Sequence, residues 1–307
     1  MDAIAGLLDG PRARGAFLLK LAFDGPWSVR IQDESPIAVI SVVRGAALIF
    51  GDGDEPIRLE PGDVAVARGP RPYTIADATG TPVQAIVHPG QECKTPDGQE
   101  LKLAWALGTR TWGNAADGAA VLMTGVYESA GEISSRLLRA LPPLLVQRLD
   151  SPLIALLADE IVKDEQGQEA VLDRLLDLIL IAVLRAYFAR PEAPGWYRAY
   201  ADPVVGPAIR MLHSEPAHPW TIQELAHRIG VSRAALARRF NDLVGEPPMA
   251  FLTGWRIALA ADLLLEPGAT VGSVAPQVGY GSSFALSTAF KRLRGISPQQ
   301  YRTATGT

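Results

Sequence analysis

The chain has 307 residues, of which 48% are hydrophobic and 20% charged, proportions that fit about two globular domains and exclude extended disorder. The net charge at pH 7 is −4, so the average over the whole chain does not indicate binding to nucleic acid or to an anionic membrane. The charge is unevenly divided: residues 205–307 carry ten basic and six acidic residues, a net charge of +4, which leaves −8 on residues 1–204. This asymmetry is expected when only one end of a protein contacts phosphate.

Targeting and membrane segments are not expected, and the sequence predicts a soluble, cytoplasmic protein without a membrane partner. The first ten residues have an acidic residue at position 2 and lack the basic and apolar regions of a signal peptide. The longest apolar run, Leu178–Leu184, is far shorter than the roughly 18–20 residues that a membrane span needs. Cys93 is the only cysteine, so an intrachain disulfide and a cysteine-built zinc site are excluded.

The first 130 residues have the pattern of a β-rich domain. Residues 2–9 are expected to form a short helix, after which apolar and polar residues alternate as in half-buried strands. Gly and Pro turns separate these segments, and Gly45 divides the longest of them into two strands. Strands are predicted over residues 27–32, 37–50, 57–59, 64–67, 73–75 and 121–127, and residues 76–118 are expected to be loops with one strand around 101–107. Short strands at this spacing predict an antiparallel barrel or sandwich.

From residue 134 onward the pattern changes to that of helices. The leucines between 137 and 145 recur at helical spacing, and further helices are predicted over residues 151–162 and 171–188. The last of these is apolar on almost every side, so we expect it to be buried, either in the core of its domain or against a second subunit. Two prolines and a glycine in 190–196 end it and place a domain boundary near 190–204.

A helix–turn–helix pattern follows in the basic third of the chain. Thr221 and Glu224 are spaced as a capping box at the start of a helix, and Gly230 is suited to the left-handed turn that ends it. Ser232 is then expected to cap a second helix, whose Leu236 and Phe240 face the core. The residues left facing outward, where a recognition helix meets base edges, are Ser232, Arg233, Ala234, Ala237, Arg238 and Asn241.

The same pattern is repeated about fifty residues later. A turn at Gly279-Tyr280-Gly281 precedes Ser282, which is expected to cap the second helix of this copy. The outward residues of that helix are Ser283, Phe284, Ser287, Thr288 and Lys291. A continuous helix over residues 249–265 lies between the copies, and it could hold two recognition helices roughly 34 Å apart, in successive major-groove segments. The alternative is an ordinary helical domain whose arginines are solvated, but two copies in about 85 residues are a stronger indication than one.

The residues from Trp220 to Arg302 resemble the DNA-binding domain of the AraC/XylS family of transcription regulators. The matching segments are WTIQELAHRIGVSRAALARRF, GEPPMAFLTGWRIALAADLLL and VGYGSSFALSTAFKRLRGISPQQYR. The front of the chain resembles, less specifically, the cupin-type ligand domain of one AraC branch. The matching segments there are GPW (25–27), VVRG (42–45), LEPGDVAVARG (59–69), ALPPLL (140–145) and VLDRLLDLIL (171–180).

The resemblance implies an α+β protein with three parts. These are a cupin-like antiparallel β-barrel that senses a small effector (residues 1–130), a helical extension that mediates dimerisation (131–203) and an all-α DNA-binding domain (204–307). The two helix–turn–helix units of the last part are expected at about 221–242 and 270–294. The implied partners are promoter or operator DNA, a second copy of the chain, an unidentified small molecule and, if the protein is an activator, RNA polymerase.

The family also implies which residues contact DNA. In the first unit the base-contacting positions match Arg233, Ala234, Ala237 and Arg238, and an arginine can pair with guanine O6 and N7. Lys291, Arg292 and Arg256 are either phosphate contacts or solvated charges. The second unit departs from the family pattern, with Thr288 where many relatives have arginine and with Gly272 and Pro276 in its first helix, which Pro276 is expected to kink or shorten. We therefore expect the first unit to set sequence specificity.

No catalytic residue, metal site or cofactor is expected in the front domain. Catalytic cupins use a His-x-His pair, a carboxylate and a later histidine, but residues 1–204 contain only one histidine, His88, which is expected in a loop. Ser41 stands where a metal ligand is expected. The alternative function is a cupin-type enzyme or ligand-binding protein with a partner-binding helical tail.

The interior of the predicted barrel is instead expected to bind a small organic effector. Trp27, Tyr73 and Trp105 are candidate wall residues, although each could also be plain core. Cys93 is an alternative sensor, for oxidants or alkylating agents, because it is expected in an exposed polar loop where Lys94 would lower its pKa. Glu92 opposes that shift, and the chain has no second cysteine to resolve an oxidised one.

Overall fold

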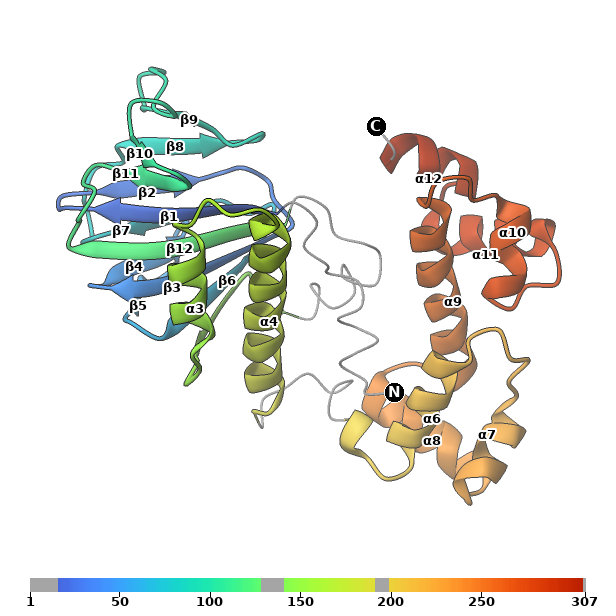
Figure 1. The fold of residues 1–307 in the computed structure, drawn as a ribbon. Coiled ribbons are helices and arrows are strands. Elements are labelled where there is room, and N and C mark those ends of the chain that lie inside the picture. The colour runs from blue at the N-terminus through green and yellow to red at the C-terminus, as the bar shows by residue number, and fades with distance from the viewer. Residues whose placement is uncertain (1–15, 128–140, 191–198, 306–307) are drawn as a thin grey trace. The chain divides into compact units, whose positions relative to one another are not determined.

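A computed structural model describes residues 16–127, 141–190 and 199–305 of the chain. They fall into two compact units, a front domain that ends at Ala189 and a C-terminal domain that begins at Arg190 (Figure 1). The helix predicted over residues 2–9 and most of the predicted helical segment from 134 to 141 lie outside the described residues. Within the described part, no helix is long and apolar enough to cross a membrane.

The front domain consists of two sheets and two helices. The first sheet contains β1 (Phe17–Phe23), β3 (Ile37–Arg44), β6 (Asp63–Arg68), β10 (Ala106–Gly108), β11 (Thr111–Gly113), β12 (Ala120–Tyr127) and β13 (Leu144–Arg148). The second contains β2 (Ser28–Ile31), β4 (Ala47–Gly51), β5 (Ile57–Leu59), β7 (Tyr73–Ala76), β8 (Ala85–His88) and β9 (Glu92–Lys94). Their strand orders are β10-β11-β1-β12-β3-β6-β13 and β5-β4-β7-β2-β8-β9. The strands predicted from alternation and turn residues are confirmed, including the break at Gly45.

Both sheets are mixed, whereas the sequence pattern predicts antiparallel pairing throughout. Strand β1 pairs in parallel with β11, and β2 pairs in parallel with β8. The second case follows from the chain path, because β7 and β8 are consecutive and lie on opposite sides of β2. Since β7 is antiparallel to β2, the returning strand β8 has to be parallel to it.

Two predictions about local structure are wrong. The segment 76–118 contains four strands (β8, β9, β10 and β11), and only the end of the strand predicted at 101–107 is extended, because residues 102–105 form a turn. Leu144 and Leu145 belong to strand β13 and not to a helix, since β13 forms an antiparallel ladder with β6. Strands of three to five residues are too short to show a clear period, and pairing with a distant strand decides their conformation.

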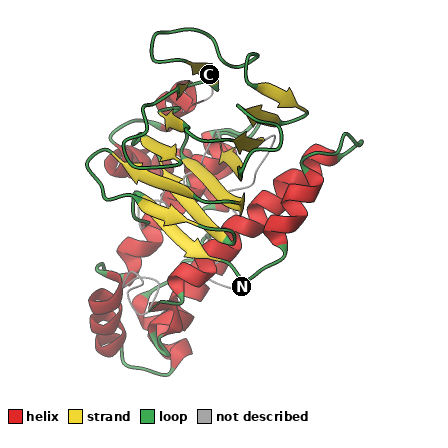
Figure 2. Ribbon diagram, turned by 90° about the vertical axis from the view of Figure 1, so that its left-hand side faces the viewer, coloured by secondary structure: helices red, strands yellow, loops and turns green. Residues whose placement is uncertain are grey.

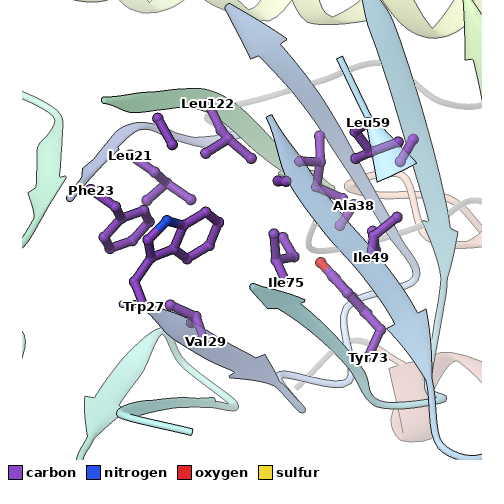
Figure 3. Close-up of a cluster of buried hydrophobic side chains, with 14 of the residues drawn as sticks. Leu21, Phe23, Trp27, Val29, Ala38, Ile49, Leu59, Tyr73, Ile75 and Leu122 are labelled. Atoms are coloured by element: carbon purple, nitrogen blue, oxygen red, sulfur yellow. The ribbon is translucent and has the colours of Figure 1, made fainter. Parts of the chain in front are cut away.

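The core of the front domain lies between the two sheets. Phe23, Ile40 and Leu122 from the first sheet and Ile49 and Leu59 from the second are fully buried in one cluster. Figure 3 shows this cluster, with the rings of Trp27 and Phe23 side by side and the hydroxyl of Tyr73 directed inward. The centroids of the Trp27 and Phe23 rings are 4.5 Å apart and the rings are stacked.

Helices α3 (Leu153–Glu160) and α4 (Gln168–Phe188) run side by side against the seven-stranded sheet (Figures 1 and 2). Gly125 of β12 allows this close approach, because a Cβ at that position would lie 2.5 Å from a methyl carbon of Leu176. The Tyr127 hydroxyl donates a hydrogen bond to Asp177 of α4 (3.0 Å). The apolar helix α4 is only partly buried, since 47% of Leu178 and 46% of Val171 remain exposed within the chain.

The C-terminal domain is entirely helical in its described residues. Its helices are α6 (Val205–Ser214), α7 (Ile222–Ile229), α8 (Arg233–Val244), α9 (Pro248–Leu264), α10 (Val271–Gln277), α11 (Ser283–Arg294) and α12 (Pro298–Thr305). One core lies among α6, α7, α8 and the start of α9, and a second lies among the end of α9, α10 and α11. Figure 1 shows that the long helix α9 connects these two groups of helices, as the sequence predicts. The β-rich front and helical rear together confirm the predicted α+β class.

Candidate nucleic-acid interface

The first helix–turn–helix consists of α7, the turn at Gly230 and α8. The Thr221 hydroxyl accepts a hydrogen bond from the Glu224 amide (3.1 Å), as a capping residue does. The reciprocal half of the predicted capping box is absent from the described contacts, because the Glu224 carboxylate instead contacts His218 Nε2 (3.0 Å) and accepts a hydrogen bond from Arg228 (2.8 Å). Gly230 has a φ of 79°, which favours glycine, so the sharp turn predicted between the helices is confirmed.

The reading face of α8 is positioned by its cap and its core contacts. The Ser232 hydroxyl accepts a hydrogen bond from the Ala235 amide (3.2 Å), and Leu236 and Phe240 are fully buried below the helix. These anchors direct the opposite side of the helix to solvent. The predicted contact residues lie there: Ser232, Arg233, Ala234, Arg238 and Asn241 are exposed, and Ala237 is half-buried.

The second helix–turn–helix repeats this construction with different caps. A complete capping box joins Thr270 and Ser273 at the start of α10, a pair that the sequence interpretation missed. Helix α10 ends one residue after Pro276, in agreement with the expected shortening. Ser282 caps α11 by accepting a hydrogen bond from the Ala285 amide (3.1 Å). The predicted contact residues Ser282, Ser283, Phe284, Thr288, Lys291 and Arg292 are exposed and Ser287 is half-buried.

The basic side chains of this domain divide into paired and unpaired groups. Arg239 makes a bidentate ion pair with Asp202 (2.7–3.0 Å), and Arg228 pairs with Glu224. Four other basic side chains form no ion pair or hydrogen bond with any described residue: Arg233, Arg238, Lys291 and Arg292. These four belong to the two exposed helix faces, so their charges are available to an external anion.

Of the two roles that the sequence leaves open for Arg256, that of a solvated charge is wrong, and that of a phosphate contact stays a prediction. Arg256 donates hydrogen bonds from Nε to the carbonyl of Pro216 (2.6 Å) and from Nη2 to the carbonyl of His218 (2.8 Å). Its guanidinium lies 6.0 Å from the centre of the Tyr280 ring, and burial lowers the pKa of Arg256. Arg256 therefore connects the loop before α7 to the turn of the second motif.

Gly279 completes this connection, which we call the Arg256 latch and which consists of Arg256, the loop 216–218, Gly279 and Tyr280. A Cβ on Gly279 would lie 2.8 Å from Arg256 Nη2 and 2.9 Å from backbone atoms of Ala217. Only a residue without a side chain fits there. These contacts form a second connection between the two helix–turn–helix motifs, besides helix α9.

The interior of the front domain contains a cavity of about 60 Å³ between the two sheets. Of the predicted wall residues, Trp27 and Tyr73 line it, whereas Trp105 packs beside Trp112 with 4.9 Å between ring centroids. Trp112 takes its place in the wall, and sequence reasoning missed it because it lies in a three-residue strand.

The expectation that Cys93 lies in an exposed loop with a lowered pKa is wrong, and its role as a sensor stays a prediction. Cys93 lies in β9 and not in an exposed loop, its side chain lines the cavity, and burial raises its pKa to about 11. His88 is likewise in a strand, with Nδ1 3.2 Å from Nε2 of Gln32, and Ser41 is buried in β3. Among the described residues, no group of three or more His, Cys, Asp or Glu side chains is placed to hold a metal ion.

The exposed, unpaired cations on two capped second helices define a double helix–turn–helix DNA-binding protein. Comparisons with known proteins give the same class: a cupin family model matches residues 2–189 and a helix-turn-helix domain model matches residues 225–304. AraC-like transcription regulators of Streptomyces antibioticus and Streptomyces lividans are 33% and 34% identical, each over 98% of both chains. The DNA-binding domain of AdpA, solved with a target DNA, is 33% identical over 34% of this chain and 92% of that chain, with a TM-score of 0.32.

The chain therefore belongs to the family of AraC-like transcription regulators, with a cupin domain in front of an AraC-type DNA-binding domain. Because the regulators match it over nearly their whole length, the alternative of an enzyme with a helical tail is not supported.

Proposed function

We propose that the first helix–turn–helix reads base sequence and that the second mainly grips the DNA backbone. Arg233 and Arg238 are exposed on α8 and have no ion-pair partner among the described residues, so either can pair with guanine in the major groove. Neighbouring Ala234 and Ala237 offer only apolar contact, for instance with a thymine methyl group. On α11 the corresponding face has Thr288 together with Lys291 and Arg292, which suit phosphate.

We further propose that the front domain binds a small organic effector and forms a homodimer in the cytoplasm. The apolar cavity between the sheets supports the first point, and the two exposed apolar residues of α4 support the second. In this proposal the sensor spans residues 1–130, the dimerising extension 131–203 and the DNA-binding domain 204–307. An effector would change the promoter affinity of the paired domains and, in an activator, their contact with RNA polymerase.

The proposal depends on one observation, the unpaired arginines on the exposed face of α8. The test begins with selection of duplexes from a random oligonucleotide pool by the full chain, followed by binding to duplexes with single base-pair substitutions in each half-site. Arg238→Ala is expected to remove about 1–3 kcal/mol of discrimination at one base pair of one half-site. Thr288→Ala is expected to leave base preference unchanged.

A matched control and a salt titration separate base reading from charge. Arg239→Ala removes the same charge from the adjacent position, but its side chain is held by Asp202, so we expect lower stability with unchanged base preference. Lys291→Ala should weaken binding equally on all sequences and reduce the slope of log K against log salt by about 1. Equal base discrimination in both half-sites would contradict the division of roles between the two motifs.

A further inference from the structure

Aromatic and aliphatic side chains form almost all of the surface of the cavity in the front domain, and Asp33 is the one carboxylate among its described lining residues. Four residues at alternate positions, Trp27, Val29, Ile31 and Asp33, line it from one face of β2 and its continuation, as the two-residue period of a strand requires. Phe17, Phe23, Tyr73 and Trp112 supply further aromatic surface. None of the described residues that line the cavity is basic.

The carboxylate of Asp33 is held by neutral donors. It accepts hydrogen bonds from the Ser35 amide (3.2 Å), the Ser35 hydroxyl (2.8 Å) and the Gln91 amide group (3.1 Å). Within the described residues no lysine, arginine or histidine forms an ion pair with it. Burial raises the pKa of Tyr73, and the negative charge of Asp33 raises it further.

Aromatic rings next to a carboxylate that has no basic partner among the described residues favour a positively charged ligand. Aromatic faces attract cations through their quadrupole, and a carboxylate adds a charge-assisted hydrogen bond to an ammonium group. A carboxylic acid or a phosphate would instead meet a like charge without a basic partner. The volume of about 60 Å³ is well below the roughly 150 Å³ that admits benzene, so the guest has only a few non-hydrogen atoms.

We propose that the cavity binds a small alkylamine in its ammonium form, with the charge at Asp33 and the alkyl chain on the aromatic wall. The proposal rests on the sensor function proposed above and adds the chemical class of the effector.

The experiment is calorimetric titration of the full chain with ethylamine, ethanol and acetate at pH 7 and constant ionic strength. These probes are small enough for the cavity, are similar in size and differ in charge. Ethylammonium should bind at least ten times more tightly than ethanol, and acetate should not bind. Asp33→Asn should remove most of the preference for the amine and leave the affinity for ethanol unchanged. Glu34→Gln removes the same charge from the exposed neighbouring residue and should retain the preference.

Cys93 gives a second readout, because it is the only cysteine and lines the same cavity. Ethylamine at saturation should slow its modification by methyl methanethiosulfonate, and acetate should not. The proposal is overturned if acetate binds as tightly as the amine, if none of the three probes binds, or if Glu34→Gln acts like Asp33→Asn. The ligand series on the unsubstituted chain is decisive even if Asp33→Asn does not fold. Retention of selected DNA, measured in parallel, shows separately whether the regulator itself binds DNA.

Discussion

Arg238 and Arg239 are adjacent in sequence and chemically identical, yet the fold gives them different tasks. Arg239 is held by Asp202, a residue 37 positions away, while Arg238 has no ion-pair partner among the described residues. Asp202 also accepts hydrogen bonds from the amides of Val204 and Val205 (both 2.9 Å) at the start of α6. Helix periodicity correctly assigned Arg238 to the exposed face, but a partner so distant in sequence could not be predicted.

The ion pair predicts a pH-dependent contribution to stability. Hydrogen bonding to Arg239 and to two backbone amides lowers the pKa of Asp202 from its ordinary value of 3.8. A lowered pKa in the folded state stabilises the protein above pH 3.8, and this stabilisation is lost as the pH falls through the folded-state pKa. Asp202→Asn should therefore lower the free energy of unfolding by about 1 kcal/mol at pH 7. In urea unfolding the difference from the unsubstituted chain should shrink below pH 3.8.

Asp242→Asn is the control for this experiment, since Asp242 is exposed in the same domain. It should change the unfolding free energy little at either pH. A loss at pH 7 that is equal for the two variants would assign no special role to the Asp202 ion pair.

Cys93 shows the limit of reading reactivity from neighbours in sequence. Lys94 is adjacent, but its ammonium donates a hydrogen bond to Glu92 (2.7 Å), and β9 directs the thiol into the cavity wall. With a pKa of about 11 against an ordinary 9.0, the thiolate fraction near pH 7.5 falls about 100-fold. Modification by Ellman's reagent should be slower by at least this factor in the native protein than in urea. Equal rates would show that the thiol is accessible and ionised.

At the scale of elements, the sequence predicts the parts that depend on local chemistry. Ser232 and Ser282 cap the two recognition helices where the pattern places them, and the strands set by clear alternation are found. The strands that the sequence analysis missed are stabilised by strands distant in sequence: β13 pairs with β6, and β8 pairs with β2. No local pattern contains that information, and the role of Arg256 was missed for the same reason.

The two turn glycines offer a matched pair for testing the Arg256 latch. Both have left-handed backbones, with φ of 79° at Gly230 and 77° at Gly279, so alanine should cost about 1 kcal/mol at each. A Cβ at Gly230 meets nothing within 4 Å, whereas at Gly279 it meets the backbone of Ala217. Gly279→Ala should therefore cost about 1–3 kcal/mol more than Gly230→Ala in chemical unfolding. Similar losses in the two variants would mean that the latch yields without strain.

At the scale of the whole molecule, the charge is divided between an acidic front and a basic C-terminal part that contains the DNA-binding domain. The unpaired cations Arg233, Arg238, Lys291 and Arg292 all lie in the basic C-terminal domain, as the division of charge along the sequence predicts. The apolar side chains left exposed on α4 lie in the acidic front domain. The division of charge along the sequence predicts which part of the chain contacts DNA, and the helix faces add which residues are expected to do so.

The proposed homodimer can be tested by substitutions on the exposed face of α4. Val171 and Leu178 are one heptad apart on α4, so they lie on the same side of the helix. Leu178→Asp should convert a dimer to a monomer in sedimentation at micromolar concentration, because a charge in an apolar interface loses its hydration. Leu103→Asp, at a leucine that is 88% exposed in the same domain, should leave the dimer intact. A monomeric unsubstituted chain would remove the proposed interface.

The Arg256 latch has a consequence for the DNA as well as for the protein. On the proposal that both motifs contact one duplex, motifs whose separation is fixed cannot adjust to the groove spacing, and bending or twisting of the duplex has to compensate for any misfit. Smooth bending of a short site costs on the order of 1–6 kcal/mol and depends on how deformable the intervening base steps are. Promoters with the same contacted bases should therefore differ in occupancy according to the flexibility of the spacer between them, a form of sequence preference at base pairs that no side chain reads.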